Sequence, residues 1–140
     1  MSFVNDKIFN TFKEFFKRFS RLVKDVGKEV GITNSEAKVI SCLSENKELT
    51  NSELVKLCDA DKAAMSRILN KLENEKIIKS DHNETNKKNL YSKLTEQGKT
   101  IAEKIKNAFE KKKTEYFACL SKAEEEILMA LFSKMFVKTN

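Results

Sequence analysis

The chain has 140 residues, of which 34% are charged and 40% are hydrophobic, a balance that excludes an extended disordered protein. The net charge of +6 is compatible with an anionic partner such as nucleic acid, but it does not identify one. No apolar run approaches the roughly 20 residues of a membrane helix, and the N-terminus lacks the features of a secretory signal. We therefore expect one cytoplasmic domain that does not enter a membrane.

Long helices are predicted at both ends of the chain, which has three glycines and no proline. From about residue 5 to residue 30, apolar side chains recur at steps of three, four and seven residues. They form a stripe too wide for one neighbouring helix, which suggests that part of it packs across a subunit boundary. Gly31 follows as a left-handed stop. The last helix opens with a capping box of Ser121 and Glu124 and is strongly amphipathic.

Two more capping boxes predict the starts of the second and third helices. Glu36 lies three residues after Thr33, and Glu53 lies three residues after Thr50. In each pair, the side chain of one residue could accept a hydrogen bond from the backbone N–H of the other. A fourth helix is predicted from about Asp61 to Asn74. Its apolar residues Ala64, Met65, Ile68, Leu69 and Leu72 share one face.

The opposite face of the fourth helix has the composition of a DNA recognition helix. It carries small, polar and cationic residues, namely Lys62, Ala63, Ser66, Arg67 and Asn70. Small residues permit close approach to the major groove, while the others can bond base edges or phosphates. Thr50 and Ser52, at the start of the preceding helix, are candidates for phosphate contacts.

A β-hairpin is predicted directly after this helix. One strand is expected near residues 76–80 and a second at residues 90–94, with the polar segment DHNETNKKN between them. Asn86, Lys87 and Lys88 lie at the expected tip, where they could contact the DNA backbone or a minor groove. A hairpin in this position would be the wing of a winged helix-turn-helix.

The cysteines and the histidine do not indicate an enzyme. Cys42, Cys58 and Cys119 are odd in number and form no CxxC pair, which fits a reducing compartment better than a disulfide framework. His82 has no partner at metal-ligand spacing, so we expect neither a metal nor another cofactor. Each cysteine is expected to be a small buried residue, with Cys58 as a candidate for oxidant sensing.

The order of elements and the motifs resemble the MarR family of winged helix-turn-helix transcriptional regulators. The resemblance rests on Leu49–Ile78, which contains Leu49-Thr50, Ser66-Arg67 and Leu72-Glu73, and on Leu90–Lys99, which contains Leu94-Thr95 and Gly98. It implies a mainly α-helical fold with a small β-hairpin. In this interpretation residues 33–95 form the DNA-binding lobe, and residues 1–32 and 96–140 are dimerisation helices.

The resemblance also implies a homodimer that binds double-stranded DNA at a palindromic operator, usually as a repressor, and that can be released by a small effector molecule. The expected dimerisation residues lie on the first and last helices and are Phe9, Phe12, Phe16, Phe19, Ile127, Leu131, Phe132 and Phe136. Two positions depart from the family pattern. The wing has Lys87 and Lys88 where arginines are usual, and Lys76 stands where a glycine commonly ends the recognition helix, which leaves the form of that helix end open.

Two other functions compete with DNA binding. A helical dimer that binds only another protein would share the amphipathic helices but would not need Lys62, Arg67 or the lysines of the wing. A thiol enzyme would need a base or cation beside a cysteine, and the one histidine is distant from each cysteine in the sequence.

Overall fold

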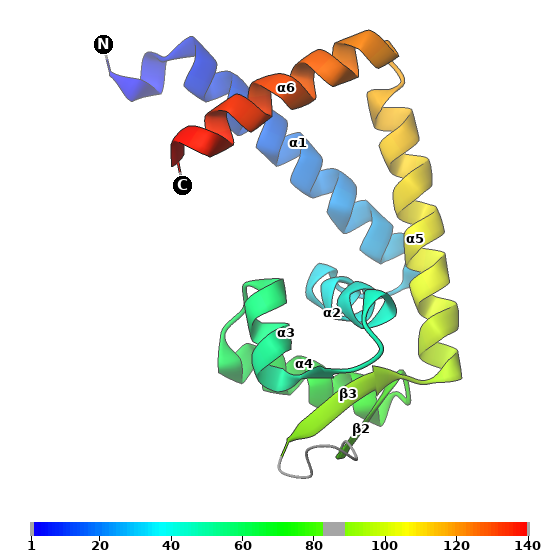
Figure 1. The fold of residues 1–140 in the computed structure, drawn as a ribbon. Coiled ribbons are helices and arrows are strands. Elements are labelled where there is room, and N and C mark those ends of the chain that lie inside the picture. Colours follow the sequence, from blue (N-terminus) through cyan, green and yellow to red (C-terminus); the bar gives the residue numbers. More distant parts are fainter. Residues whose placement is uncertain (1, 83–88, 140) are drawn as a thin grey trace. The chain divides into compact units, whose positions relative to one another are not determined.

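The computed structural model describes residues 2–82 and 89–139, and its architecture confirms the predicted fold class (Figure 1). The chain divides into two units, residues 1–109 and 110–140, each compact in itself. The helices are the short 3-10 helix η1 (Phe3–Asn5), α1 (Lys7–Val30), α2 (Asn34–Glu45), α3 (Asn51–Cys58), α4 (Lys62–Asn74), α5 (Glu96–Phe117) and α6 (Lys122–Thr139). The strands are β1 (Leu49–Thr50), β2 (Ile78–His82) and β3 (Leu90–Leu94).

Side-chain caps define where most of the helices begin. The Asp6 carboxylate accepts a 2.8 Å hydrogen bond from the backbone N–H of Phe9, so α1 starts at Lys7, slightly later than the sequence suggested. The predicted box at Thr50 and Glu53 is confirmed, with both reciprocal bonds present. Asp61 is the N-cap of α4, and its carboxylate accepts a hydrogen bond from the Ala64 N–H at 2.7 Å.

The prediction for Thr33 and Glu36 was only half right. The Thr33 hydroxyl accepts a hydrogen bond from Glu36 N–H at 3.1 Å, as an N-cap should. The Glu36 carboxylate, however, is buried and accepts a 2.7 Å bond from Lys71 Nζ on α4. A partner 35 residues away in the sequence has replaced the local one, because burial requires the carboxylate to find a strong donor.

The predicted hairpin is confirmed, and a third strand joins it. β2 and β3 pair antiparallel, with Ser80 opposite Ser92, but β2 begins two residues later than expected. β1 pairs with the other edge of β3, so the strand order is β1-β3-β2. β1 has two residues and leads directly into α3, so its pairing holds the start of α3 against the wing.

One apolar core joins the helices of the first unit to the sheet. The fully buried side chains come from four different elements, namely Val39 and Ile40 of α2, Leu54 of α3, Met65 and Leu72 of α4, and Ile78 of β2. Leu94 at the end of β3 and Ile105 on α5 belong to the same cluster. Since α4 contributes its whole apolar face to this core, its polar face must point outward.

The end of α4 keeps a left-handed turn even though glycine is missing. Lys76 has a φ of 61°, and its N–H donates to the carbonyl of Glu73 at 3.0 Å. The next N–H, of Ile77, donates to the carbonyl of Leu72 at 2.9 Å. These two bonds form a Schellman motif, and they explain why β2 cannot begin at Lys76. At the end of α1, Gly31 takes the predicted left-handed conformation with a φ of 84°.

A tight joint connects the end of α4 to the start of α5. The Thr95 N–H donates to the carbonyl of Ile77 at 3.0 Å, and the Thr95 hydroxyl proton lies between the carbonyls of Lys76 at 2.7 Å and Ile77 at 3.0 Å. The same hydroxyl accepts from Gly98 N–H at 3.0 Å, which makes Thr95 the N-cap of α5. A Cβ on Gly98 would lie 2.1 Å from the Ile77 carbonyl oxygen, so glycine is required for this close approach.

The second unit contains the last turns of α5 and the whole of α6. The predicted capping box is present, because Ser121 N–H donates to Glu124 Oε1 at 2.9 Å and Glu124 N–H donates to Ser121 Oγ at 3.1 Å. The backbone hydrogen bond from Ser121 lowers the pKa of Glu124. Apolar side chains on α6 remain widely exposed, among them Ile127 at 60% and Leu131 at 51%.

We expect Lys76→Gly to stabilise the protein by about 1 kcal/mol, because a residue with a Cβ is strained at this positive φ. The gain is reduced by a few tenths of a kcal/mol, since a cation leaves the C-terminal end of a helix. Urea unfolding followed by circular dichroism measures the change. Lys79→Gly, at an exposed position of β2, is the matched control and should be destabilising by about 0.5–1 kcal/mol. A loss of stability in Lys76→Gly would contradict the strain argument.

Candidate nucleic-acid interface

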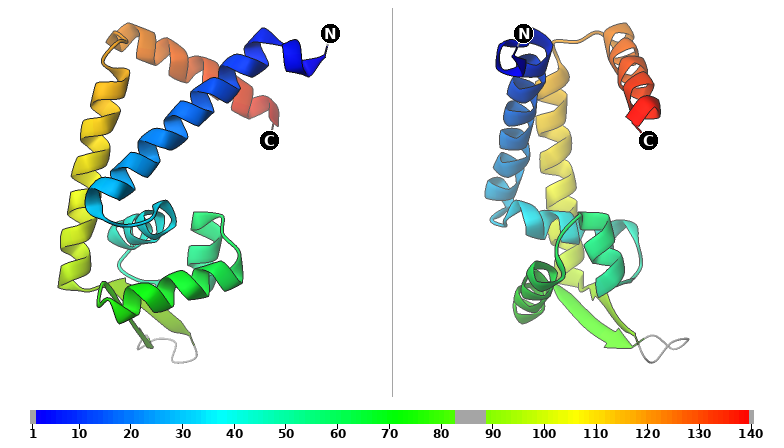
Figure 2. Two further views of the ribbon diagram at one scale, coloured as in Figure 1. Left: turned by 180° about the vertical axis from the view of Figure 1, so that it is seen from behind. Right: turned by 90° about the vertical axis from the view of Figure 1, so that its left-hand side faces the viewer.

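The outer face of α4 presents the side chains that the sequence singled out. Met65, Leu69 and Leu72 are buried. On the opposite side, the predicted DNA-facing residues Lys62, Ala63, Ser66, Arg67 and Asn70 are all exposed. In both views of Figure 2, the hairpin projects from the helices of this unit on the side where α4 lies. An exposed polar helix beside a projecting hairpin is the arrangement of a helix and a wing.

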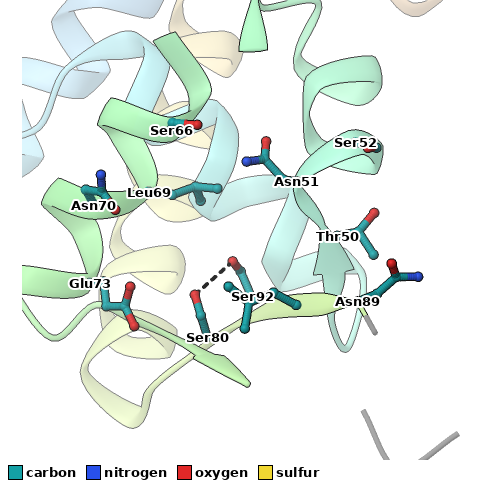
Figure 3. Close-up of a pocket in the computed structure, with 11 residues that line it drawn as sticks. Thr50, Asn51, Ser52, Ser66, Leu69, Asn70, Glu73, Ser80, Asn89 and Ser92 are labelled. Atoms are coloured by element: carbon teal, nitrogen blue, oxygen red, sulfur yellow. Dashed lines mark hydrogen bonds between the residues drawn. The ribbon is translucent and has the colours of Figure 1, made fainter. Parts of the chain in front are cut away.

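A polar hollow of about 280 Å³ lies between α3, α4 and the sheet. Figure 3 shows the lining residues, which come from all three and include four of the predicted DNA-contact residues, Thr50, Ser52, Ser66 and Asn70. Lys62, Ala63 and Arg67 are exposed on α4 but do not line it. The structure therefore groups the hydroxyl and amide residues in one place and leaves the cations of α4 beside it.

The hydroxyl of Thr50 is already engaged within the cap. It donates to Glu53 Oε1 at 3.0 Å and accepts from Glu53 N–H at 3.2 Å. Its proton is thus not free for a phosphate. The Ser52 hydroxyl and the unsatisfied N–H groups of the first turn of α3 are better placed to act as donors.

Several residues of the hollow were not found by the sequence analysis. Asn51, Glu73, Ser80, Asn89 and Ser92 also line it. Ser80 and Ser92 face each other across the hairpin, with their hydroxyl oxygens 3.4 Å apart. The alternation of the two strands could have revealed this pair once the register was known. Asn86, Lys87 and Lys88, the predicted tip of the wing, lie outside the described residues.

Acidic residues reduce the positive charge that α4 presents. Among the described residues that line the hollow, Glu73 is the one with a charge. Lys71 is tied to the buried Glu36, whose side chain is 5% exposed. The hydrogen bond to Glu36 and the charge of that carboxylate raise the pKa of Lys71. This lysine is held toward α2 as a structural cation, which leaves Lys62 and Arg67 as the cations of the outer face.

Cys42 of α2 and Cys58 of α3 meet within the first unit. Their sulfur atoms are 3.8 Å apart, and both thiols are free, as is the exposed Cys119. Burial, with a smaller contribution from Cys42, raises the pKa of the Cys58 thiol to about 11. Because the thiolate is the form that reacts with peroxides, this shift weighs against the predicted role of Cys58 in oxidant sensing, which stays a prediction.

The described residues give no sign of a metal centre or of a membrane segment. Within residues 2–82 and 89–139, histidine, cysteine and carboxylate side chains form no group of three or more that could hold a metal ion. In the same ranges, no helix combines the length and the apolar character that crossing a bilayer requires.

We expect alkylation of Cys58 by iodoacetamide to be slow at pH 8 and to rise steeply as the pH approaches 11, because the raised pKa keeps the thiol protonated. Peptide mapping by mass spectrometry follows Cys58 separately, and the exposed Cys119 of the same chain is the internal control. The same measurement in urea removes the effect of burial and should bring the Cys58 rate to that of an ordinary thiol. A fast reaction of native Cys58 at pH 8 would contradict the shift.

Comparisons with known proteins agree with this geometry. Residues 32–90 match the model of the MarR family. The HTH-type transcriptional regulator PchR of Bacillus subtilis (strain 168) is 27% identical over 124 residues, which are 88% of this chain and 72% of that protein. A mutant of MepR from S. aureus has the same fold, with a TM-score of 0.79 and 20% identity over 94% of this chain and 97% of the other.

A second solved structure links the fold to nucleic acid in another protein. It is a mutant of MarR from E. coli complexed with operator DNA, with a TM-score of 0.76 and 23% identity over 90% of this chain and 91% of the other. At these identities the structures establish the shared fold, and the family match covers the segment from the start of α2 to the start of β3. Together they show that the chain is similar, in this segment and in its fold, to the MarR family of winged helix-turn-helix transcriptional regulators.

Proposed function

We propose that this protein binds double-stranded DNA in a sequence-specific manner and acts as a repressor in the cytoplasm. The observation that carries the proposal is the exposed polar face of α4, which stands beside the hairpin on a firmly packed helix. A related fold is complexed with operator DNA in the MarR structure from E. coli. The proposed function is binding without catalysis, for which the exposed face of α4 offers hydrogen-bonding groups and cations.

The proposed DNA-contact residues divide into those that bond base edges and those that bond the phosphate backbone of the DNA. Lys62, Ala63, Ser66 and Asn70 are the proposed base-facing positions on α4, since amide, hydroxyl and ammonium groups can bond base edges in the major groove. Arg67, Ser52 and the start of α3 would contact phosphates. Lys87 and Lys88 would add wing contacts, with Asn86 beside them.

We further propose that the protein acts as a homodimer on a palindromic operator with half-sites about 10 base pairs apart. Support comes from the apolar side chains that α1 exposes to solvent, with Ile8 at 70% and Phe16 at 71% exposure. In the second unit, Ile127 and Val137 of α6 are exposed to a similar degree. Large exposed apolar surfaces mark interaction sites in most proteins, and two helices of this kind favour a self-complementary interface.

Release by a small molecule is also part of the proposal. The hollow between α3, α4 and the sheet has a volume near the lower end of the range for small-molecule pockets. It is lined by three proposed DNA-contact residues, Ser52, Ser66 and Asn70, so a molecule bound there would compete directly with DNA.

Neutralising the wing should change the salt dependence of DNA binding. For the double variant Lys87→Ala and Lys88→Ala, we expect the slope of log affinity against log salt to become shallower by about 3.6, since the homodimer loses four phosphate contacts and each one removes roughly 0.9. Fluorescence anisotropy on a genomic fragment selected by the native protein provides the measurement. The charge-matched control replaces Lys104 and Lys106, which are exposed on α5.

Asn70→Ala tests the reading of bases in the same assay. We expect a loss of about 1–3 kcal/mol on the selected fragment, an unchanged salt slope and little effect on unrelated DNA. Failure of the native protein to retain any fragment of its own genome would favour the competing function, a helical module that binds only protein.

The dimer is tested by replacing its most exposed apolar residues. Ile8→Ser with Phe16→Ser should raise the dimer dissociation constant at least about a hundredfold, because each buried apolar side chain contributes roughly 1.5–3 kcal/mol and the symmetric interface contains it twice. Sedimentation equilibrium measures the change. Leu57→Ser is the control, since Leu57 is 56% exposed on α3, outside the proposed interface. An unchanged dimer in the double variant would contradict the proposed role of α1.

A further inference from the structure

Two thiols from different helices meet inside the DNA-binding lobe. Cys42 lies on α2 and Cys58 is the last residue of α3, and their Sγ atoms are 3.8 Å apart. Both are free thiols, and Cys58 is 9% exposed. The two residues are 16 positions apart in the sequence, so they come together only when the chain folds.

A pocket leads from outside to Cys58, whose sulfur is in contact with that of Cys42. It has a volume of about 310 Å³ and lies between α2, α3 and α4, on residues that include Lys38, Cys58, Asp61 and Met65. None of the proposed base-facing residues of α4 lines it. A ligand that enters this pocket can therefore reach Cys58 without displacing the residues that would read DNA.

We propose that Cys42 and Cys58 form a dithiol site that binds a soft, thiophilic ligand through both sulfur atoms at once, with trivalent organoarsenicals as the chemical class. In the reaction with an arsine oxide, two As–S bonds form and the As=O bond breaks. The two thiol protons leave with the oxygen as one water molecule, so neither arsenic nor sulfur changes oxidation state. No additional oxidant or reductant is required.

The local chemistry favours such a ligand over a peroxide or a conventional metal ion. Attack on a peroxide requires the thiolate, which burial makes scarce at Cys58 by raising its pKa to about 11. An arsenical forms two bonds to sulfur, so the pair holds it as a chelate, whereas a peroxide reacts with one sulfur atom at a time. A structural zinc site needs four ligands, and the described residues supply no group of three around these sulfurs.

The distance between the sulfurs suits a bidentate ligand. A tetrahedral centre with sulfur ligands about 2.3 Å away has roughly 3.8 Å between two of them, and a trigonal-pyramidal trivalent arsenic, with smaller angles between its bonds, holds them somewhat closer. The observed 3.8 Å separation thus needs little adjustment to place one centre between both sulfur atoms. A single thiol would form a weaker adduct, because it lacks the entropic advantage of a second bond from the same chain.

The test uses phenylarsine oxide and the full chain carrying Cys119→Ser, which removes the exposed thiol. We expect one adduct per chain by native mass spectrometry, retained in excess 2-mercaptoethanol and removed by dithiothreitol. Cys42→Ala and Cys58→Ala, each in the same background, should lose the retained adduct. Retention of the adduct in either single-thiol variant, or its absence from the parent, would overturn the proposal.

A measurement on the unmodified protein keeps the test independent of how well the variants fold. Phenylarsine oxide should protect Cys42 and Cys58 from N-ethylmaleimide and leave Cys119 reactive, as peptide mapping will show. Circular dichroism is recorded on the same samples. Protection that appears only when the helical signal is lost would overturn the proposal, because any two cysteines of an unfolded chain can chelate arsenic.

Discussion

The carbonyl of Ile77 is the point on which the packing of the first unit depends. It accepts a hydrogen bond from the Thr95 N–H and shares the Thr95 hydroxyl proton with the carbonyl of Lys76, and Gly98 packs directly against it. The end of α4, the start of β2, the end of β3 and the start of α5 are thereby held within a few residues of one another. Because the orientation of α4 relative to the hairpin is set at this joint, the proposed reading and positioning residues depend on backbone groups that touch no DNA.

The local part of this architecture could be predicted from the sequence. Capping boxes join residues three apart, so Thr50 with Glu53 and Ser121 with Glu124 were visible as motifs and are confirmed. The two faces of α4 followed from helical periodicity, and the exposure of Ser66 and Asn70 agrees. The hairpin followed from alternating residues on either side of a polar segment.

Features that depend on tertiary contacts could not be predicted. The ion pair of Glu36 with Lys71 and the meeting of Cys42 with Cys58 join residues far apart in the sequence, and no local pattern signals either of them. β1 has two residues, too few to show alternation. Because Lys76 stands where glycine is common, the form of the helix end was left open, yet the backbone bonds that close α4 impose a left-handed turn on this lysine.

The pairing of Lys71 with Glu36 has a consequence for the electric field around the protein. The net charge of +6 suggests a generally positive chain, but a lysine on the recognition helix already has its counter-ion within the fold. Approaching DNA would find that charge screened at short range by a fixed carboxylate and would release fewer condensed cations than a count of lysines implies. Long-range attraction of DNA would then depend more on cations outside α4 than on Lys71. The part of α4 around Lys71, whose charge is neutralised, would contribute to discrimination through hydrogen bonds.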